Sequence, residues 1–156
     1  MKTGKTEKAI FAAGCFWHPE EVFAKTPGVL STRVGYIGGK TPHPSYQQVC
    51  SLNTGHIEAT EVTFNPKEIS YEKLLDVFWN IHDPTTKDRQ GLDVGSQYNS
   101  AVFYLNAKQK NQALSSKAER QALTSRKIVT QIRKAGKFWQ AEEYHQRYME
   151  KNKFGF

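Results

Sequence analysis

The stretch KAIFAAGCFWHPEE, residues 8–21, holds the transition that organises the fold. Its first part contains an apolar run, residues 9–13, and residues 8–13 have the length of a short buried strand. Residues 19–25 open on a proline and two glutamates, which are typical of the first turn of a helix. The stretch therefore predicts a buried strand, a tight turn and a helix in direct succession.

Cys15 falls between the strand and the helix. A cysteine at a helix N-terminus meets free backbone N–H groups and the positive end of the helix dipole, and both favour the thiolate. Phe16 and Trp17 follow at once and form an apolar wall beside the thiol. Because most cysteines are small buried hydrophobic residues, a structural interpretation is also open. The pattern makes Cys15 a candidate nucleophile that acts on a small apolar substrate.

Helix and strand signals alternate along the rest of the chain. The predicted strands are residues 28–36, 55–65, 101–105 and 127–133, and the predicted helices are residues 45–51, 71–81, 107–123 and 141–149. Such a mixture predicts an α+β fold, a two-layer α/β sandwich with a mainly antiparallel sheet. A length of 156 residues predicts one catalytic domain, residues 1–156, with short N-terminal and C-terminal tails. Residues 82–100 form a long irregular stretch, and loops of that length are usually functional.

Composition excludes several classes of protein. No apolar run approaches the roughly 20 residues that span a bilayer, and the N-terminus carries no secretory signature. We therefore expect a cytoplasmic protein with no membrane contact. Two cysteines, Cys15 and Cys50, make neither a disulfide framework nor a zinc site, so no metal is expected.

The charge is concentrated in the C-terminal third. Residues 1–104 hold 10 Lys and Arg against 11 Asp and Glu, whereas residues 105–156 hold 12 against 4. A basic third suggests nucleic-acid binding, and a basic interaction module is one alternative to an enzyme. The basic residues are spread rather than clustered, however, and nucleotide-binding and RNA-binding motifs are absent from the sequence. We expect a solvated basic face and no nucleic acid.

A nucleophilic Cys15 needs a proton donor and polar groups beside it. The strand 55–65 has no wholly apolar face, so Glu58 can face a polar pocket. Tyr46 follows a loop rich in Pro and His, and Asp93 and Tyr98 lie in the long irregular stretch. These four residues are the candidates.

Seven segments occur in one order from residue 14 to residue 146. They are GCFW (14–17), YIGG (36–39), SY (45–46), TGHIE (54–58), HDPTT (82–86), QGLDVGSQY (90–98) and AEEYHQ (141–146). In this order they closely resemble the A-type peptide methionine sulfoxide reductases. The resemblance implies an α/β sandwich with a ferredoxin-like core and an oxidoreductase that repairs oxidised proteins under oxidative stress. It also implies reduction of the S epimer of methionine sulfoxide, free or in proteins, without a metal, flavin or nicotinamide cofactor.

The resemblance assigns roles to seven residues. Cys15 is the nucleophile, which becomes a sulfenic acid. Glu58 is the acid, and Tyr46 and Tyr98 bind the sulfoxide oxygen. Asp93 supports the pocket, and Phe16 and Trp17 hold the substrate methyl group. The motif histidines, His56 and His145, are read as structural or supporting residues. A monomer is expected.

The chain departs from the family where the oxidised cysteine is recycled. Many members carry a resolving cysteine in a C-terminal tail, but no cysteine follows Cys50 in this sequence. Two routes are open. An external thiol (thioredoxin, glutaredoxin or glutathione) reduces Cys15 directly, which we favour, or Cys50 resolves it.

Other departures concern the surroundings of the site. Leu92 stands where the family commonly has Asn, and Asn99 where an Arg often follows the tyrosine, so the polarity of the pocket rim differs. His18 and Pro19 replace smaller residues. An imidazole near Cys15 would also suit a rival enzyme, a cysteine acyl-transferase or hydrolase with His18 as its base.

Overall fold

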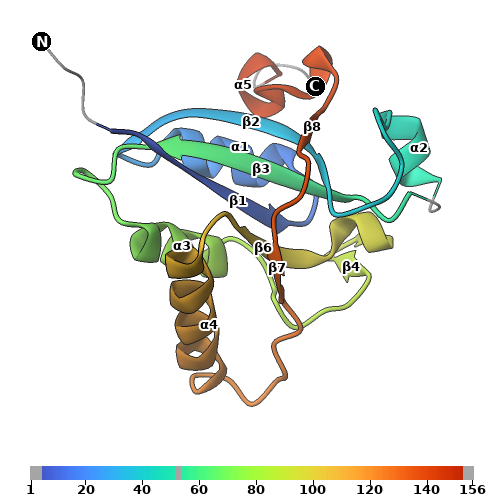
Figure 1. The fold of residues 1–156 in the computed structure, drawn as a ribbon. Coiled ribbons are helices and arrows are strands. Elements are labelled where there is room, and N and C mark those ends of the chain that lie inside the picture. The colour runs from blue at the N-terminus through green and yellow to red at the C-terminus, as the bar shows by residue number, and fades with distance from the viewer. Residues whose placement is uncertain (1–4, 52–53, 153–156) are drawn as a thin grey trace, which may run out of the picture.

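The computed structural model describes residues 5–51 and 54–152. Within them the main sheet runs β7-β6-β1-β3-β2-β8 (Figure 1). Its strands are β1 (Glu7–Ala13), β2 (Val29–Ile37), β3 (Ile57–Phe64), β6 (Ser100–Tyr104), β7 (Gln131–Lys134) and β8 (Trp139–Gln140). Neighbouring strands are antiparallel except for the parallel pair β6 and β7.

The helices and short elements complete this architecture. The helices are α1 (Trp17–Ala24), α2 (Tyr46–Cys50), α3 (Tyr71–Asn80), α4 (Ala107–Gln121) and α5 (Tyr148–Lys151). A small hairpin joins β4 (Arg89–Gln90) to β5 (Asp93–Val94), and two 3-10 turns are η1 (Ser96–Tyr98) and η2 (Glu143–His145). The order β1-α1-β2-β3-α3-β6, with strands arranged β6-β1-β3-β2, is that of a ferredoxin-like core. The predicted α+β sandwich is confirmed.

One face of the sheet is covered by α1, α3 and α4 (Figure 1). Phe11 of β1 lies at the centre of this layer, with its ring 5.1 Å from Phe23, 6.0 Å from Tyr71 and 5.4 Å from Phe78. Burying this many aromatic side chains is the main favourable term for joining the helices to the sheet.

The chain between β7 and β8 crosses the opposite face (Figure 1). Ala135 and Phe138 of this crossing segment pack on a small apolar cluster that includes Ile10 and Ile57. The crossing runs so close to β2 that a Cβ atom at Gly35 would overlap the Trp139 carbonyl oxygen and the Phe138 ring. Glycine at residue 35 is therefore required for the crossing segment to lie flat on the sheet.

Two helices begin at a serine cap. Ser70 caps α3 by accepting the Lys73 N–H at 3.0 Å. Ser45 caps α2 in a reciprocal capping box with Gln48. A serine hydroxyl satisfies an N–H group that has no partner inside the helix, so these starts follow from local chemistry.

Residues 141–149 do not form the single helix that the sequence predicts; they contain η2 and only the start of α5. The Gln146 amide binds both the N–H and the carbonyl oxygen of Val34 at 2.9 Å. Arg147 adopts a left-handed backbone conformation, and its N–H donates to Glu20 at 2.7 Å. Hydrogen bonds to other parts of the fold thus replace the helical ones.

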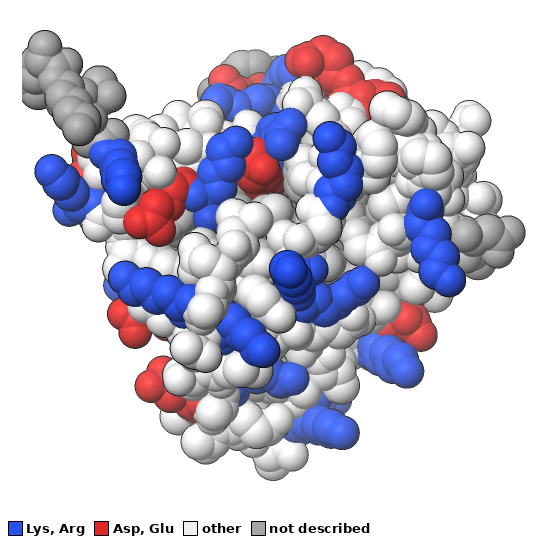
Figure 2. Space-filling model, in the orientation of Figure 1, with Lys and Arg blue, Asp and Glu red and all other residues white. Residues whose placement is uncertain are grey.

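Two other predictions need correction. The strand predicted at 127–133 is shorter and is β7, and the irregular stretch 82–100 contains the β4–β5 hairpin and η1. Within the described ranges, no helix has the length and apolar character to cross a membrane. Lys and Arg are scattered over the visible face with acidic residues among them (Figure 2), as expected of a solvated surface.

Candidate active site

The active-site turn follows directly from the end of β1. Gly14 has φ +89°, and a Cβ atom there would lie 2.7 Å from the Gln90 side chain. Only glycine combines this backbone conformation with such close packing. Cys15 therefore lies in the turn between β1 and α1, directly before Phe16, the N-cap of the helix. The helix starts at Trp17, two residues earlier than predicted.

The Cys15 thiol is half-buried at this helix start. Burial raises its pKa to about 12, although the N–H of Trp17 acts in the opposite direction. The negative charges of Glu58 and Asp93 contribute to the rise. The expectation that the helix terminus favours a thiolate is therefore wrong for the resting site: the N–H contact exists, but desolvation outweighs it and the thiol keeps its proton.

Glu58 projects from β3 to the α1 side of the sheet and is 1% exposed. Its Oε1 accepts the backbone N–H of Phe16 at 3.2 Å. Its Oε2 is buried without a hydrogen-bond partner in the described part of the chain. Burial raises the pKa of Glu58 to about 8, and the Asp93 charge adds to this shift. The carboxyl group is thus neutral at pH 7 and lies next to the residue that follows the cysteine.

Tyr46, Tyr98 and Asp93 lie around the same point. Burial raises the pKa of Tyr98 to about 12, and the neighbouring charges of Glu58, Asp93 and both cysteines add to the rise. Tyr46 is the first residue of α2; its pKa is also raised, first by burial and then by Cys50, Tyr98 and Glu58. Asp93 is exposed at the rim on β5. The structure brings the predicted polar residues together around Cys15.

The two aromatic residues after Cys15 have different surroundings. Phe16 is 1% exposed and packs in a cluster with Val34 and Tyr36. Trp17 is half-buried. Its indole N–H donates to Nδ1 of His145 at 3.0 Å, and its ring stacks on Tyr148 at 3.8 Å. Trp17 is therefore held in place on two sides, whereas Phe16 belongs mainly to the core.

His18 does not fulfil the role that a rival hydrolase needs. It is exposed on the first turn of α1. The groups whose charge acts on the Cys15 pKa are Glu58, Asp93 and Cys50. No histidine is among these groups, so the structure adds nothing in support of a Cys–His pair with His18.

Sequence and structure comparisons agree on the relationship. The model of the family described as peptide methionine sulfoxide reductase matches residues 7–156. A reductase of this name (MsrA) from Methanosarcina acetivorans is 56% identical over 150 residues, covering 95% of this chain and 80% of its own. The chain belongs to this reductase family.

Solved structures give the same result for the fold. The reduced form of Mxr1 from Saccharomyces cerevisiae matches with a TM-score of 0.92 at 37% identity, covering 97% of this chain and 88% of its own. Mxr1 in complex with Trx2 matches with a TM-score of 0.67 at 26% identity, covering 95% and 89%. The predicted A-type assignment is confirmed by the names of these relatives.

Sequence reasoning gave too little weight to two supporting residues of the reductase. Glu142 accepts the Tyr36 hydroxyl and the Tyr46 N–H, each at 2.9 Å, and so ties the start of α2 to the end of β2. His145 is 1% exposed, and besides Trp17 its ring lies 4.5 Å from Tyr46. Both belong to the AEEYHQ segment, so the signal was the motif itself. Residues 141–146 therefore hold both Tyr46, through Glu142, and Trp17, through His145.

His56 has a structural role. Its Nδ1 accepts the Gly39 N–H at 3.1 Å, and its Nε2 lies 2.7 Å from the Thr41 carbonyl oxygen. A neutral imidazole that accepts at Nδ1 and donates at Nε2 satisfies both contacts. His56 thus holds the loop between β2 and α2 without reaching the thiol chemistry.

Cys50 lies nearer to the site than its buried-cysteine pattern indicated. It ends α2, one turn after Tyr46, and is half-buried. Its charge raises the pKa of Cys15 and of Tyr98. A second thiol of the reductase therefore lies on the edge of the site.

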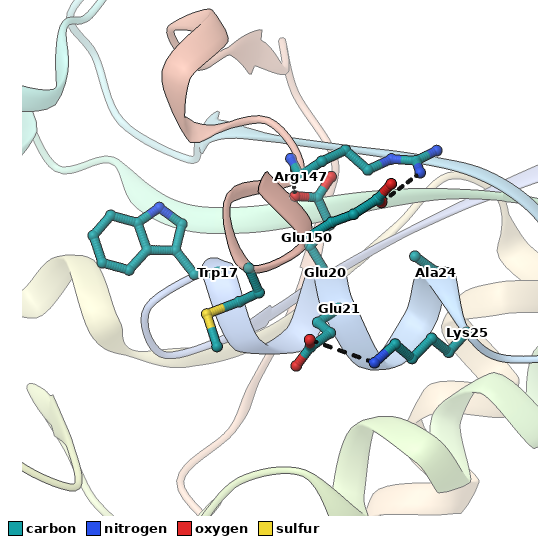
Figure 3. Close-up of a pocket in the computed structure, with 8 residues that line it drawn as sticks. Trp17, Glu20, Glu21, Ala24, Lys25, Arg147 and Glu150 are labelled. Atoms are coloured by element: carbon teal, nitrogen blue, oxygen red, sulfur yellow. Dashed lines mark hydrogen bonds and ion pairs between the residues drawn. The ribbon is translucent and has the colours of Figure 1, made fainter. Parts of the chain in front are cut away.

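A separate cavity of about 290 Å³ lies between α1 and α5, with Trp17 at one end (Figure 3). Glu20, Arg147 and Met149 are among its lining residues. Glu21 pairs with Lys25 at 3.5 Å, and Arg147 pairs with Glu150 at 3.1 Å. Neither Cys15 nor Glu58 lines this cavity, so it is distinct from the reaction site.

Proposed function

We propose that this reductase returns the S epimer of methionine sulfoxide, free or in proteins, to methionine through a sulfenic acid on Cys15. The observation that carries the proposal is the state of Glu58. A carboxyl group that keeps its proton to about pH 8, with a buried oxygen that lacks a partner among the described residues, is suited to protonate a sulfoxide oxygen.

The proposed step balances without an added reactant. Glu58 gives its proton to the sulfoxide oxygen while the sulfur of Cys15 forms a bond to the sulfoxide sulfur. The thiol proton of Cys15 replaces the one that Glu58 gave. The hydroxyl group then passes with the electron pair of the breaking S–O bond to the Cys15 sulfur. The bond between the two sulfurs breaks in the same step and leaves its electron pair on the substrate sulfur, so methionine departs and Cys15 holds the hydroxyl group as a sulfenic acid. Two electrons pass from the cysteine sulfur to the substrate sulfur.

Protonation of the substrate also explains how Cys15 can react although its resting pKa is high. A sulfoxide that accepts a proton becomes cationic, and a positive charge beside the thiol favours its ionised form. The thiolate would then form only when substrate is present. A neutral resting thiol is also less open to oxidation than a thiolate.

Tyr46 and Tyr98 are proposed to hold the sulfoxide oxygen. Both have a raised pKa, so their hydroxyl groups stay protonated and can donate. Preorganised donors of this kind stabilise charge as it forms on an oxygen. Asp93, exposed at the rim, is proposed to help keep Glu58 protonated through its negative charge. The fixed indole of Trp17, with Phe16 behind it, is proposed to receive the methyl group of the substrate.

Recycling is proposed to use an external thiol. The thiol attacks the sulfenic sulfur of Cys15, releases water and leaves a mixed disulfide, which a second thiol reduces. The Mxr1 complex with Trx2 supports a thioredoxin as the donor. Glutaredoxin and glutathione are the other donors considered, and Cys50 is the alternative resolving group. We propose that the protein acts as a cytoplasmic monomer.

The test is intact-mass analysis of the reduced protein after one dose of the S epimer of methionine sulfoxide, without reductant and with a sulfenic-acid trap. A trap adduct on Cys15, together with free methionine, is the expected result. A disulfide between Cys15 and Cys50 would keep the reductase and change the recycling route. A folded protein that forms no methionine and no adduct would refute the proposal, and Cys15→Ser is the matched control.

A further inference from the structure

The segment HDPTT, residues 82–86, takes no part in the proposed reaction but is held firmly by its own side chains. His82 Nδ1 lies 2.7 Å from a main-chain carbonyl oxygen of α3, and its Nε2 lies 2.7 Å from the Ser100 hydroxyl. Burial lowers the pKa of His82 to about 4, so the ring is neutral, with its proton on Nδ1 and Nε2 as the acceptor. The Asp83 carboxylate accepts the N–H of Thr85 at 2.9 Å. Asp83 therefore lies in an anchored loop.

The side chain of Gln90, on β4, is bound to this loop by two hydrogen bonds. Its amide oxygen accepts the N–H of Asp83 at 2.8 Å, and its amide N–H donates to the Asp83 carbonyl oxygen at 2.7 Å. A free glutamine side chain samples many rotamers, and two bonds to one anchored residue remove most of that freedom. Gln90 is therefore held in one position although it lies on a short hairpin.

The methylene groups of Gln90 pack against the catalytic turn. A Cβ atom placed on Gly14 would lie 2.7 Å from Cγ and 2.9 Å from Cβ of Gln90, and the three heavy atoms nearest to it all belong to this side chain. Glycine has more backbone freedom than any other residue, so its conformation needs support from its neighbours. Gln90 supports the residue that directly precedes Cys15.

Gln90 and Asp93 are directly paired in the β4–β5 hairpin, and the side chains of such a pair lie on the same face. Because Gln90 faces the catalytic turn, Asp93 lies on that side of the hairpin as well. Its charge raises the pKa of both Cys15 and Glu58, in agreement with this placement. The hairpin therefore presents one packing group and one charge to the reaction site.

We propose that Gln90 is a positioning residue for sulfoxide reduction, which holds the catalytic turn and the rim carboxylate of Asp93 in register with each other. The inference rests on the proposed function and adds a residue that acts through others. Gly14 leads directly into Cys15, and the next N–H binds Glu58 at 3.2 Å, so a shift of Gly14 changes the distance between thiol and acid. A shift of Asp93 changes the charge that Glu58 experiences, and with it the pKa of the acid.

The test is Gln90→Met, which keeps the methylene groups but has no amide to bind Asp83. The matched control is Gln121→Met. Gln121 is also half-buried, and its amide accepts the Ile128 N–H at 2.8 Å and donates to the Arg126 carbonyl oxygen at 2.9 Å, both outside the catalytic turn. The measured quantity is the single-turnover rate of methionine formation from methionine-(S)-sulfoxide between pH 6 and 9, and urea unfolding shows whether each variant is folded.

Gln90→Met is expected to lower the rate at pH 7 about ten-fold, because small displacements of reacting groups cost rates of this order or more. The pH at which the rate falls, about 8 in the wild type, is expected to move lower as the released Asp93 moves out into solvent. In an Asp93→Asn background the same substitution should leave this pH unchanged. Gln121→Met should change neither quantity.

A folded Gln90→Met protein with the wild-type rate would overturn the proposal, as would an equal fall of the rate in Gln121→Met. A lower rate with an unchanged pH profile would also overturn it, since it would show a general loss of packing. Gln90→Asn, which keeps the amide on a shorter stem, provides the same comparison if Gln90→Met does not fold. Wild-type protein that forms no methionine would instead refute the reductase chemistry itself.

Discussion

The backbone N–H of Phe16 donates to Oε1 of Glu58 at 3.2 Å, so the residue after the nucleophile holds the acid directly. Among substitutions at residue 16, only proline removes this donor. The bond occupies one carboxyl oxygen, and within the described residues Oε2 is buried without a hydrogen-bond partner. The turn that positions Cys15 therefore also positions the acid, whereas burial keeps the acid protonated against the effect of this hydrogen bond.

The first prediction concerns the pH dependence of sulfenic acid formation. Glu58 must be protonated to act, and its pKa is raised to about 8 by burial. The single-turnover rate is expected to be flat near neutral pH and to fall as pH rises through about 8. Glu58→Gln should lower the rate by at least about 100-fold, the usual contribution of a general acid. A rate that rises steadily from pH 7 to 10 would show that ionisation of Cys15 controls the step instead.

The second prediction concerns stability. Glu58 is neutral in the folded protein but ionises near pH 4.5 when unfolded, so folding takes up a proton between these values. The stability is therefore fully present below pH 4.5 and declines as pH rises towards 8. Glu58→Gln removes this dependence and should stabilise the protein by up to about 3 kcal/mol at pH 7, and by little at pH 4.5.

The matched control for this variant is Glu61→Gln, on the same strand. Glu61 faces the other side of the sheet and pairs with Arg33 at 2.6 Å. Its loss should bring no gain in stability at pH 7. Urea unfolding of wild type and both variants at pH 4.5, 6 and 7.5 measures the effect. Parallel pH curves for wild type and Glu58→Gln would contradict the assigned pKa.

Four strands of the main sheet (β1, β2, β3 and β6) could be predicted from sequence because each is a short local run of strand-forming residues, whereas β8 was not predicted. The run from residue 8 to residue 13 and the strand with Glu58 needed no knowledge of the rest of the chain. The helix caps at Ser45 and Ser70 are equally local, since each bonds an N–H three residues away.

The pKa of Cys15 and the backbone conformation of residues 141–149 could not be predicted in this way. The pKa of Cys15 depends on how much chain covers it, which a helix-terminus argument does not contain. The break at Arg147 depends on Glu20, which lies far away in sequence. The residues of the candidate site could be named from the family motifs. The burial of Cys15 and the hydrogen bond between Arg147 and Glu20 could be found only from the structure.

The third prediction concerns His145 as a positioning residue. Its Nδ1 accepts the Trp17 indole N–H, and its pKa is lowered by burial, so the ring is neutral with its proton on Nε2. His145→Phe keeps the ring but leaves the indole N–H without an acceptor. We expect KM for methionine sulfoxide to rise about ten-fold, with a smaller change in kcat, because an unpaired donor costs about 1–3 kcal/mol.

Rescue distinguishes positioning from a general loss of packing. His145→Gln fills less of the aromatic cluster than His145→Phe but offers an acceptor oxygen to the Trp17 indole N–H. Its KM should therefore lie between those of the wild type and His145→Phe. Steady-state kinetics of both variants, with urea unfolding to confirm that each is folded, provides the measurement. A His145→Phe enzyme with unchanged KM would remove His145 from the site.

The last prediction concerns Cys50. This thiol lies one turn from Tyr46 and acts on the pKa of Cys15, yet it is not needed if an external thiol attacks the sulfenic acid. With dithiothreitol or thioredoxin as donor, Cys50→Ser is expected to keep kcat within about two-fold, since conservative changes outside the reacting atoms leave transition-state stabilisation nearly intact. The trapped intermediate should be a mixed disulfide of Cys15 with the donor. Loss of thioredoxin-dependent turnover in Cys50→Ser, with methionine still formed in a single turnover, would instead make Cys50 the resolving cysteine.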